Sequence, residues 1–251
     1  MRVLIYGISG KMGKVLYNCL KESNEAEATC GVSKYLNPLE FDIPTYYECK
    51  EVDVDVDVII DFSVTQALSD YLPYAVAKKI PCVIATTGYS EEERERIKKA
   101  GEQIAVFNTG NMSLGISVLL KLARETAKAL EGKADIEIIE HHHNQKVDAP
   151  SGTALMLADG IKKELPNSKY VYGREGYCGQ RSKEEIGIHA LRGGSVVGKH
   201  EVIFYLNKEV ITLKHEAESK EIFAQGAIKA AQFIVRQSPG VYSMEDLLAQ
   251  I

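Results

Sequence analysis

The 251-residue sequence predicts an α/β protein with two domains, and two observations lead to this prediction. Short apolar runs alternate with helical patterns over residues 1 to 113, which is typical of a parallel sheet with helices on both faces. Beyond residue 113 the pattern changes to long helices and extended β-like runs. This change indicates a second domain of α+β type with a mixed or antiparallel sheet.

The first element of the chain already carries a functional signal. An apolar strand, Met1–Tyr6, leads directly into Gly7-Ile8-Ser9-Gly10-Lys11-Met12-Gly13, and a helix is expected from Lys14 to Glu22. Glycines in such a turn let the backbone approach a pyrophosphate, whose charge is stabilised at the helix N-terminus. The spacing is G-x-x-G-x-x-G, with Ser9 at the place of the usual middle glycine. We therefore expect a Rossmann-like dinucleotide-binding domain.

The remaining elements of the first domain follow in alternation. We expect strands at 28–33, 57–63, 81–85 and 104–107, and helices at 65–79 and 91–101, the former kinked or broken at Pro73. Ligands bind at the carboxyl ends of parallel strands. Four strand ends, counting that of Met1–Tyr6, carry small or polar residues: Gly7 to Gly13, Asp61 to Ser63, Ala85 to Gly88 and Thr109 to Asn111.

The end of the second strand bears on the choice of cofactor. An acidic residue at this place usually binds the ribose hydroxyls of NAD, whereas a basic residue suits the 2′-phosphate of NADP. Here the candidates are Ser33 and Lys34, and no carboxylate is present. The sequence thus favours NADPH while leaving NADH open.

The second domain is expected to start with a long helix. We expect helices at 114–130, 153–165, 221–237 and 244–249, a strand at 134–140, and β-like runs at 186–192, 195–206 and 209–215. No tract of low complexity and no internal repeat interrupts these elements.

The segment from Glu137 to Ala154 holds the densest group of reactive side chains. Three adjacent histidines, His141–His143, are followed by Lys146 and by a Ser151-Gly152-Thr153 turn that opens an apolar helix. Imidazole and ammonium groups can move protons near pH 7, and a helix N-terminus favours an anion. The segment predicts a pocket for a carboxylate-bearing substrate that gains or loses a proton.

Simpler readings of the same segment remain open. The histidines could lie in an exposed loop, and Ser151 and Thr153 could serve only as helix caps. A metal site is not expected, because His141 and His143 would share one face of a strand without obvious further ligands. Asp148, before Ala149-Pro150, is interpreted as a turn former rather than a catalyst.

Composition excludes several classes of function. The net charge of −5 argues against a general nucleic-acid binder, and no apolar run approaches the roughly 20 residues that span a bilayer. The first residues have the pattern of a strand rather than of a secretory signal. Five scattered cysteines without C-x-x-C spacing are interpreted as reduced thiols. We therefore expect a cytoplasmic protein with neither a nucleic-acid nor a membrane partner.

Over essentially its whole length the chain resembles the 4-hydroxy-tetrahydrodipicolinate reductase (dihydrodipicolinate reductase) family. The most specific match is Glu140-x-His142-His143-x-x-Lys146-x-Asp148-Ala149-Pro150-Ser151-Gly152-Thr153-Ala154. Further matches are the Gly7 to Gly13 turn, Asp61-Phe62-Ser63, Thr86-Thr87-Gly88, Asn111-Met112-Ser113-x-Gly115, Arg192-x-Gly194-x-x-x-Gly198-x-His200-Glu201 and Phe223-Ala224-x-Gly226-Ala227.

The resemblance implies reduction of a cyclic dicarboxylate by NAD(P)H in lysine and diaminopimelate biosynthesis. It implies that His142 and Lys146 form an acid/base pair, and that His143, Lys146, Ser151, Gly152 and Thr153 bind the substrate. It also implies a cofactor site made by Gly7, Ile8, Ser9, Gly10, Lys11, Met12, Ala85, Thr86, Thr87, Thr109, Gly110, Asn111 and Met112. Ser33 and Lys34 are added to this site because of their place at the end of the second strand.

The resemblance further implies the domain organisation and the assembly. Residues 1–113 and 220–251 would form the dinucleotide-binding domain, and residues 114–219 would bind substrate and form a homotetramer through their sheet. The chain departs from the family pattern at Asn144 and Gln145, where relatives often have basic residues. It also has Ala85 in place of a common glycine, and Ser33 in place of an acidic residue.

Three other functions would account for parts of the sequence. Another NAD(P)-dependent dehydrogenase of similar architecture, acting on a semialdehyde or an imine, would keep the glycine turn but would leave the histidine–lysine segment without a role. A nucleotide sensor that has lost catalysis would predict loss of His142 or Lys146, and both are present. A metal-binding protein using His141 and His143 should respond to a chelator.

Overall fold

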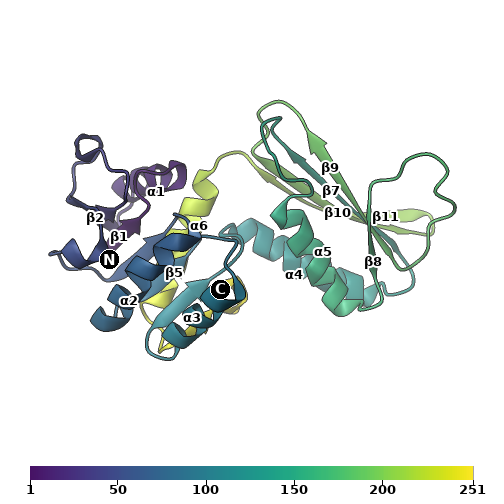
Figure 1. Ribbon diagram of the computed structural model, residues 1–251. Coiled ribbons are helices and arrows are strands. Elements are labelled where there is room, and N and C mark those ends of the chain that lie inside the picture. The colour runs from purple at the N-terminus through teal and green to yellow at the C-terminus, as the bar shows by residue number, and fades with distance from the viewer. Residues whose placement is uncertain (251) are drawn as a thin grey trace. The chain divides into compact units, whose positions relative to one another are not determined.

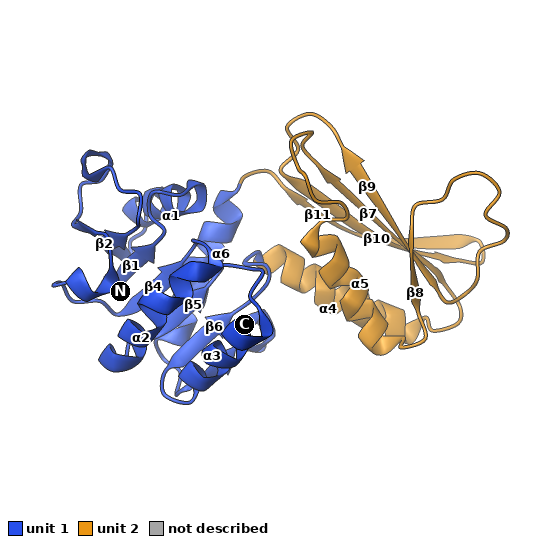
Figure 2. Cartoon of the chain, viewed as in Figure 1, with its two compact units in different colours: residues 1–113, 220–251 blue, residues 114–219 orange. Residues whose placement is uncertain are grey.

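The computed structural model of the chain describes residues 1–250, which divide into two compact units. The first unit comprises residues 1–113 and the residues from 220 onward, and the second comprises residues 114–219 (Figure 2). Each unit has its own sheet, drawn with its helices in Figure 1. The predicted α/β fold class, with a parallel first sheet and a mixed second sheet, is confirmed.

The first unit is built on a seven-stranded parallel sheet. Its strands are β1 (Arg2–Tyr6), β2 (Glu27–Val32), β3 (Thr45–Tyr46), β4 (Val58–Asp61), β5 (Cys82–Ile84), β6 (Ala105–Asn108) and β12 (Gly240–Tyr242). They are ordered β12-β6-β5-β4-β1-β2-β3, and every neighbouring pair is parallel. The central strands are buried on both faces, which is why β4 reads as an uninterrupted apolar run up to Asp61.

Helices cover both faces of this sheet. They are α1 (Lys11–Lys21), α2 (Leu68–Lys78), α3 (Glu91–Gly101), α6 (Glu221–Ile234) and α7 (Met244–Leu248), with 3-10 turns at Pro38–Glu40, Cys49–Glu51 and Thr65–Ala67. Val106 packs in the apolar cluster beneath α2 and α3. Its neighbour Phe107 points to the other face and meets Phe233 of α6, with ring centroids 6.1 Å apart.

Two helices differ from expectation for local reasons. The helix α1 begins at Lys11 rather than Lys14, because Gly10 in an extended conformation already serves as its N-cap. The expected break at Pro73 is absent, and α2 runs unbroken to Lys78. Proline has no backbone N–H, so the carbonyl of Ser69 lacks its donor within the helix. Both residues lie on the exposed side of the helix, where water can donate to this carbonyl.

The second unit is a five-stranded mixed sheet with two helices. Its elements are α4 (Leu114–Ala129), β7 (Asp135–His142), α5 (Gly152–Glu164), β8 (Lys169–Tyr172), β9 (Glu185–Arg192), β10 (Gly198–Leu206) and β11 (Glu209–Ala217). The strand order is β11-β10-β7-β9-β8, with β10 antiparallel to both of its neighbours. Both helices pack on one face of the sheet, around a core that includes Ile136 and Ile138 (Figure 1).

Strand β7 determines which side chains reach the interior of this unit. It extends to His142, two residues further than expected, and its burial alternates strictly along the strand. Ile136, Ile138, Glu140 and His142 therefore share the buried face under the helices. A glutamate and a histidine are thus placed side by side in an otherwise apolar row.

Candidate active site

The glycine turn after β1 is shaped by close backbone contacts. Gly7 has φ = +85°, and a Cβ there would lie 2.7 Å from the carbonyl oxygen of Phe62. A Cβ at Gly13 would overlap the carbonyl oxygen of Gly7. Both positions therefore require glycine, because the turn packs against the chain after β4 and the helix packs against the turn.

The N-terminus of α1 is suited to a phosphate. Gly10 is its N-cap and contributes no side-chain cap, and the first turn of the helix contains no acidic residue. The first backbone N–H groups of a helix have no partner within the helix, and the helix dipole adds partial positive charge at that end. The turn and the helix end together fit the pyrophosphate of a dinucleotide.

The end of β2 meets the glycine turn through two hydroxyl groups. The Oγ atoms of Ser9 and Ser33 are 2.5 Å apart, and the amide of Tyr35 donates to Ser33 Oγ at 3.4 Å. Lys34 is exposed beside them, and Lys14 of α1 forms an ion pair of 2.6 Å with Glu40. This edge offers hydroxyls and an ammonium, and it offers no carboxylate at the end of β2.

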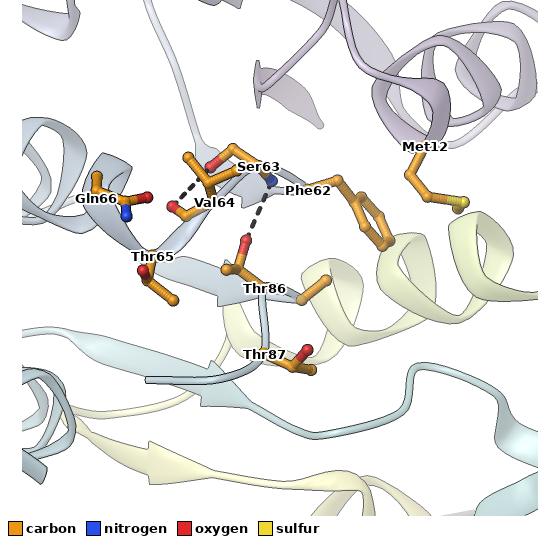
Figure 3. A pocket seen from close by; sticks show the side chains of 9 residues that line it. Met12, Phe62, Ser63, Val64, Thr65, Gln66, Thr86 and Thr87 are labelled. Carbon is orange, nitrogen blue, oxygen red and sulfur yellow. Dashed lines mark hydrogen bonds between the residues drawn. The ribbon is translucent and has the colours of Figure 1, made fainter. Parts of the chain in front are cut away.

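A pocket of about 440 Å³ lies at the carboxyl ends of β4 and β5 (Figure 3). Figure 3 shows Met12 of α1 near the ring of Phe62, with the turn of Thr86 and Thr87 below them. The backbone N–H of Ser63 donates to Thr86 Oγ1 at 3.1 Å, which joins the two strand ends. The residues that line the pocket are Met12, Phe62, Ser63, Val64, Thr65, Gln66, Ala85, Thr86 and Thr87.

Two apolar side chains among the predicted cofactor residues are buried. Ile8 is buried, and its side chain fills the space above Gly31. Met112 is buried too, with its carbonyl oxygen packed against Gly226. A cofactor at this edge of the sheet would therefore meet these two residues through their backbone. Thr109 and Asn111 form a small turn in which the Asn111 amide donates to Thr109 Oγ1 at 3.4 Å.

In the second unit, the carboxylate of Glu140 is the centre of a hydrogen-bond network. Its side chain is 0% exposed. Arg192 donates to both carboxylate oxygens, at 2.8 and 2.7 Å, and the Ser151 amide donates at 3.0 Å. His142 Nδ1 lies 2.6 Å from Oε2. Burial acts to raise the pKa of Glu140, but hydrogen bonds from Arg192, His142 and Ser151 outweigh it and lower that pKa.

The same carboxylate fixes the state of His142. Burial lowers the pKa of the His142 imidazole, Glu140 opposes that shift, and the charges of Lys146 and Arg192 add to it. A lowered pKa leaves the ring neutral near pH 7, and the short contact with a carboxylate places its proton on Nδ1. The other ring nitrogen, Nε2, is then an acceptor that can take up a proton.

His200 supports this arrangement from the neighbouring strand. Its ring meets that of His142 edge to face, with centroids 5.1 Å apart, and its Nε2 lies 3.2 Å from Ser151 Oγ. Ser151 Oγ also accepts from the Ala154 amide at 3.2 Å and so caps α5. Burial, helped by His142, lowers the pKa of His200 to about 3, so this ring adds no charge to the site.

Lys146 and His143 lie in the loop between β7 and α5. The Lys146 ammonium is 2.7 Å from Asp148 and its side chain is 21% exposed. The loop is held by backbone bonds from His143 to Val196 and from Lys146 to His143, at 2.8 and 3.2 Å. His143 Nδ1 is buried and has no hydrogen-bond partner within residues 1–250, so a ligand could satisfy it.

Sequence reasoning assigned no role to several members of this network. Glu140, Arg192 and His200 were recognised only as part of a resemblance, and Asp148, interpreted as a turn former, also pairs with Lys146. The alternation along β7 could have placed Glu140 beside His142. Within residues 1–250, no group of three or more His, Cys, Asp or Glu side chains is arranged to hold a metal ion.

Family models match nearly the whole chain. The model described as dihydrodipicolinate reductase, N-terminus, matches residues 1–112, and the one described as dihydrodipicolinate reductase, C-terminus, matches residues 115–248. The chain belongs to the dihydrodipicolinate reductase family. The resemblance inferred from the sequence is thereby confirmed. The gap between the two matches coincides with the passage from the first compact unit to the second.

Individual members of the dihydrodipicolinate reductase family are similar over the full chain. The 4-hydroxy-tetrahydrodipicolinate reductase of Caldanaerobacter subterraneus subsp. tengcongensis is 53% identical over 249 residues, covering 99% of this chain and 98% of the relative. That of Clostridium tetani is 45% identical, with 99% and 97% covered.

Solved structures share the fold at lower identity. A dihydrodipicolinate reductase from Paenisporosarcina sp. TG-14, with dipicolinate bound, has a TM-score of 0.83 at 23% identity and 98% coverage of both chains. A probable dehydrogenase from Thermotoga maritima has a TM-score of 0.63 at 14% identity, with 98% of this chain and 92% of that one covered. No helix among residues 1–250 is long and apolar enough to cross a membrane.

Proposed function

We propose that this chain reduces 4-hydroxy-tetrahydrodipicolinate to tetrahydrodipicolinate with NAD(P)H, in lysine and diaminopimelate biosynthesis. The observation that carries the proposal is the buried Glu140–His142 pair, set close to Lys146 and to the start of α5 in the unit that matches the family's C-terminal model. This arrangement combines a proton donor or acceptor, an ammonium group and a helix N-terminus, which suits a dianionic substrate.

The first unit is proposed to bind the cofactor. The Gly7–Gly13 turn and the start of α1 would hold the pyrophosphate, and the pocket beside Ala85, Thr86 and Thr87 would take the nicotinamide end. The backbone of Thr109 to Met112 follows β6 at the same edge of the sheet and would complete the site. When bound, the reduced nicotinamide supplies a hydride.

The loop from β7 to α5 is proposed to bind the substrate. The Lys146 ammonium would offset the charge of one of the two substrate carboxylates. Because this ammonium already forms an ion pair with Asp148, the substrate and Asp148 would share it. His143, Ser151, Gly152 and Thr153 would hold the other carboxylate at the start of α5, where the helix dipole favours negative charge. Asn144 and Gln145 are exposed and uncharged, so the positive field of this loop depends mainly on Lys146.

Protonation is proposed to involve His142 and Lys146. The reaction adds one hydride and one proton to the ring and releases water, so a proton must be delivered each turnover. A bound dianion raises the pKa of a nearby imidazole, which allows His142 to take a proton from solvent and pass it on. Glu140 keeps the ring oriented and stabilises the imidazolium while it lasts.

The preferred nicotinamide is proposed to be NADPH, with NADH as a usable alternative. Lys34 is exposed at the end of β2, where an ammonium can meet a 2′-phosphate. Ser33, tied to Ser9, offers a hydroxyl in place of the carboxylate that would bind two ribose hydroxyls. These neutral and basic groups do not repel the additional phosphate.

We also propose a homotetramer in the cytoplasm. The face of the second sheet that α4 and α5 leave open includes the exposed apolar side chains of Leu191, Tyr205 and Val210, which a neighbouring copy would bury. All five cysteines are free thiols, as expected in a reducing compartment. Sedimentation velocity tests the assembly, and a monomer at micromolar concentration would contradict it.

The experiment that tests the proposed function separates substrate binding from cofactor binding. His142→Ala should lower turnover at least a hundredfold and weaken binding of dipicolinate, while the Kd for NADPH stays within about twofold of the wild-type value. His189→Ala is the matched control, because His189 lies in the same sheet but pairs with Glu137. Equal loss of NADPH affinity in the His142→Ala variant would contradict the proposal.

A further inference from the structure

A fully buried carboxyl group lies at the end of β4, and the proposed reaction has no use for it. Asp61 is 0% exposed, although it ends a strand at the edge where the cofactor is proposed to bind. Burying a carboxyl group is costly unless it is hydrogen-bonded throughout. The contacts of Asp61 therefore indicate what its burial achieves.

Both oxygens of this carboxyl group are occupied. Oδ1 accepts from the Ser63 amide at 3.0 Å and from the Ser63 hydroxyl, and Oδ2 accepts from Tyr71 and Tyr89 at 3.2 and 3.4 Å. The two tyrosine hydroxyls are themselves 3.3 Å apart. Burial raises the pKa of Asp61, while hydrogen bonds from Ser63, Thr86 and Tyr71 oppose that shift.

The cluster connects directly to the pocket in Figure 3. The Ser63 amide, besides donating to Asp61, donates to Thr86 Oγ1. Ser63 follows β4 and Thr86 follows β5, and both line the pocket. Asp61, Tyr71 and Tyr89 do not line it, so they can influence an occupant only through the two turns that they hold.

We propose that Asp61 is a positioning residue for the nicotinamide end of the cofactor, acting through Ser63 and Thr86. By holding the turns after β4 and β5 together, it sets the shape of the pocket before the cofactor arrives. A preformed pocket binds more tightly because less ordering is needed at the moment of binding. The inference rests on the proposed function only in that it takes a nicotinamide dinucleotide as the occupant.

Two substitutions test the inference without changing a residue that lines the pocket. Asp61→Asn keeps the shape of the side chain but replaces one of its two acceptor oxygens with an NH2 donor, and should weaken NADPH and NADH binding about tenfold each. Tyr71→Phe removes one hydroxyl group and should weaken both about threefold. The KM for the dicarboxylate substrate should stay at the wild-type value, because that site is proposed in the other unit.

Matched controls exist in the same core. Asp70 is a part-buried carboxylate that accepts from Tyr6 at 2.8 Å and from the Cys49 amide, and neither Asp70 nor Tyr6 lines the pocket or bonds to Asp61 through its side chain. Asp70→Asn and Tyr6→Phe should therefore lower the thermal unfolding temperature without changing either Kd. Titration of the fluorescence of NADPH and NADH with each folded variant measures these dissociation constants. If the Asp61→Asn variant does not fold, the Tyr71→Phe variant alone tests the positioning role.

The outcomes distinguish this inference from the proposed function. Weaker binding of both cofactors by the Asp61→Asn or Tyr71→Phe variant, with unchanged binding by the controls, supports the positioning role. Wild-type Kd values in folded Tyr71→Phe protein, or equal losses in the Tyr6→Phe control, overturn it while leaving the reductase proposal intact. Failure of the wild-type protein to bind either cofactor would overturn both.

Discussion

Substitution of Glu140 by glutamine should expose how much of the site depends on one buried charge. The carboxylate accepts from Arg192 in a two-pronged contact, from the Ser151 amide, and from His142 Nδ1. Glutamine keeps the shape but carries no charge, and it offers only one acceptor oxygen. It leaves the Arg192 guanidinium, whose side chain is 19% exposed, without the carboxylate that it contacts directly.

The magnitude follows from those contacts. Removing one partner of a buried ion pair costs about 3–5 kcal/mol, and glutamine retains part of the hydrogen bonding, so Glu140→Gln should lower the free energy of unfolding by about 2–4 kcal/mol. The pKa of Glu140 is lowered in the folded state. Its stabilisation is therefore present above the unfolded pKa of 4.5 and is lost as the pH falls through the lower folded value. The two proteins should become equally stable in acid.

Turnover should fall further than stability alone would explain. Without the carboxylate, His142 loses the acceptor that orients its ring and the charge that stabilises its protonated form, so kcat should drop on the order of a hundredfold. Glu140 acts to raise the pKa of His142, so its removal should lower that pKa. If His142 must be protonated for the reaction, the fall of kcat/KM with rising pH should then begin at lower pH in the variant.

Urea denaturation from pH 7 downward and pH–rate profiles measure these effects. Glu137→Gln is the matched control, because Glu137 lies on the same strand and binds Arg174, Arg181 and His189. It should cost stability but leave kcat near the wild-type value. A Glu140→Gln variant that keeps kcat within twofold, or whose pH–rate profile moves to higher pH, would show that Glu140 does not orient or charge-stabilise His142.

Three further substitutions probe other parts of the site. Gly13→Ala should abolish dinucleotide binding, because its Cβ would overlap a backbone oxygen of the glycine turn. Gly132 is the control: it has φ = +69° and no atom within 4 Å of an added Cβ, so Gly132→Ala should lower the free energy of unfolding by only about 1 kcal/mol, measured by thermal or urea unfolding. Lys146→Ala should lower kcat and raise the substrate KM at least tenfold in steady-state kinetics, whereas Lys162→Ala, which removes an ammonium that lies over a tyrosine ring, should do neither. Lys34→Glu should raise the KM for NADPH about tenfold and leave that for NADH nearly unchanged; equal changes for both cofactors would contradict the proposed site of the 2′-phosphate.

Local patterns were sufficient to predict most of the architecture. The alternation of apolar strands and amphipathic helices predicted the parallel sheet, and the changed pattern after residue 113 predicted a second, mixed sheet. The strands that escaped prediction, β3, β8 and β12, have only two to four residues and lie at sheet edges. Segments so short carry no periodicity, and their pairing depends on neighbours that the sequence does not reveal.

The networks behind the two candidate sites required the fold itself. In the sheet register His200 lies opposite Glu140, and Arg192 lies opposite His142, although they are more than 40 residues apart in the chain. Nothing in the local sequence sets that register. The hydrogen-bond partners of Asp61 also come from separate elements, because Tyr71 belongs to α2 and Tyr89 to the turn before α3. Sequence motifs found the residues of the segments themselves, but not the distant side chains that hold them.

A coupled assay of the purified protein tests the proposed reaction most directly. The synthase that condenses pyruvate with aspartate semialdehyde generates the substrate in place, and the absorbance of NADPH and of NADH is followed in separate cuvettes. We expect oxidation that requires both the substrate and this chain, and that is faster with NADPH. No oxidation of either cofactor, by folded protein that binds the dinucleotide, would contradict the proposed reaction and favour another dehydrogenase substrate or a sensor.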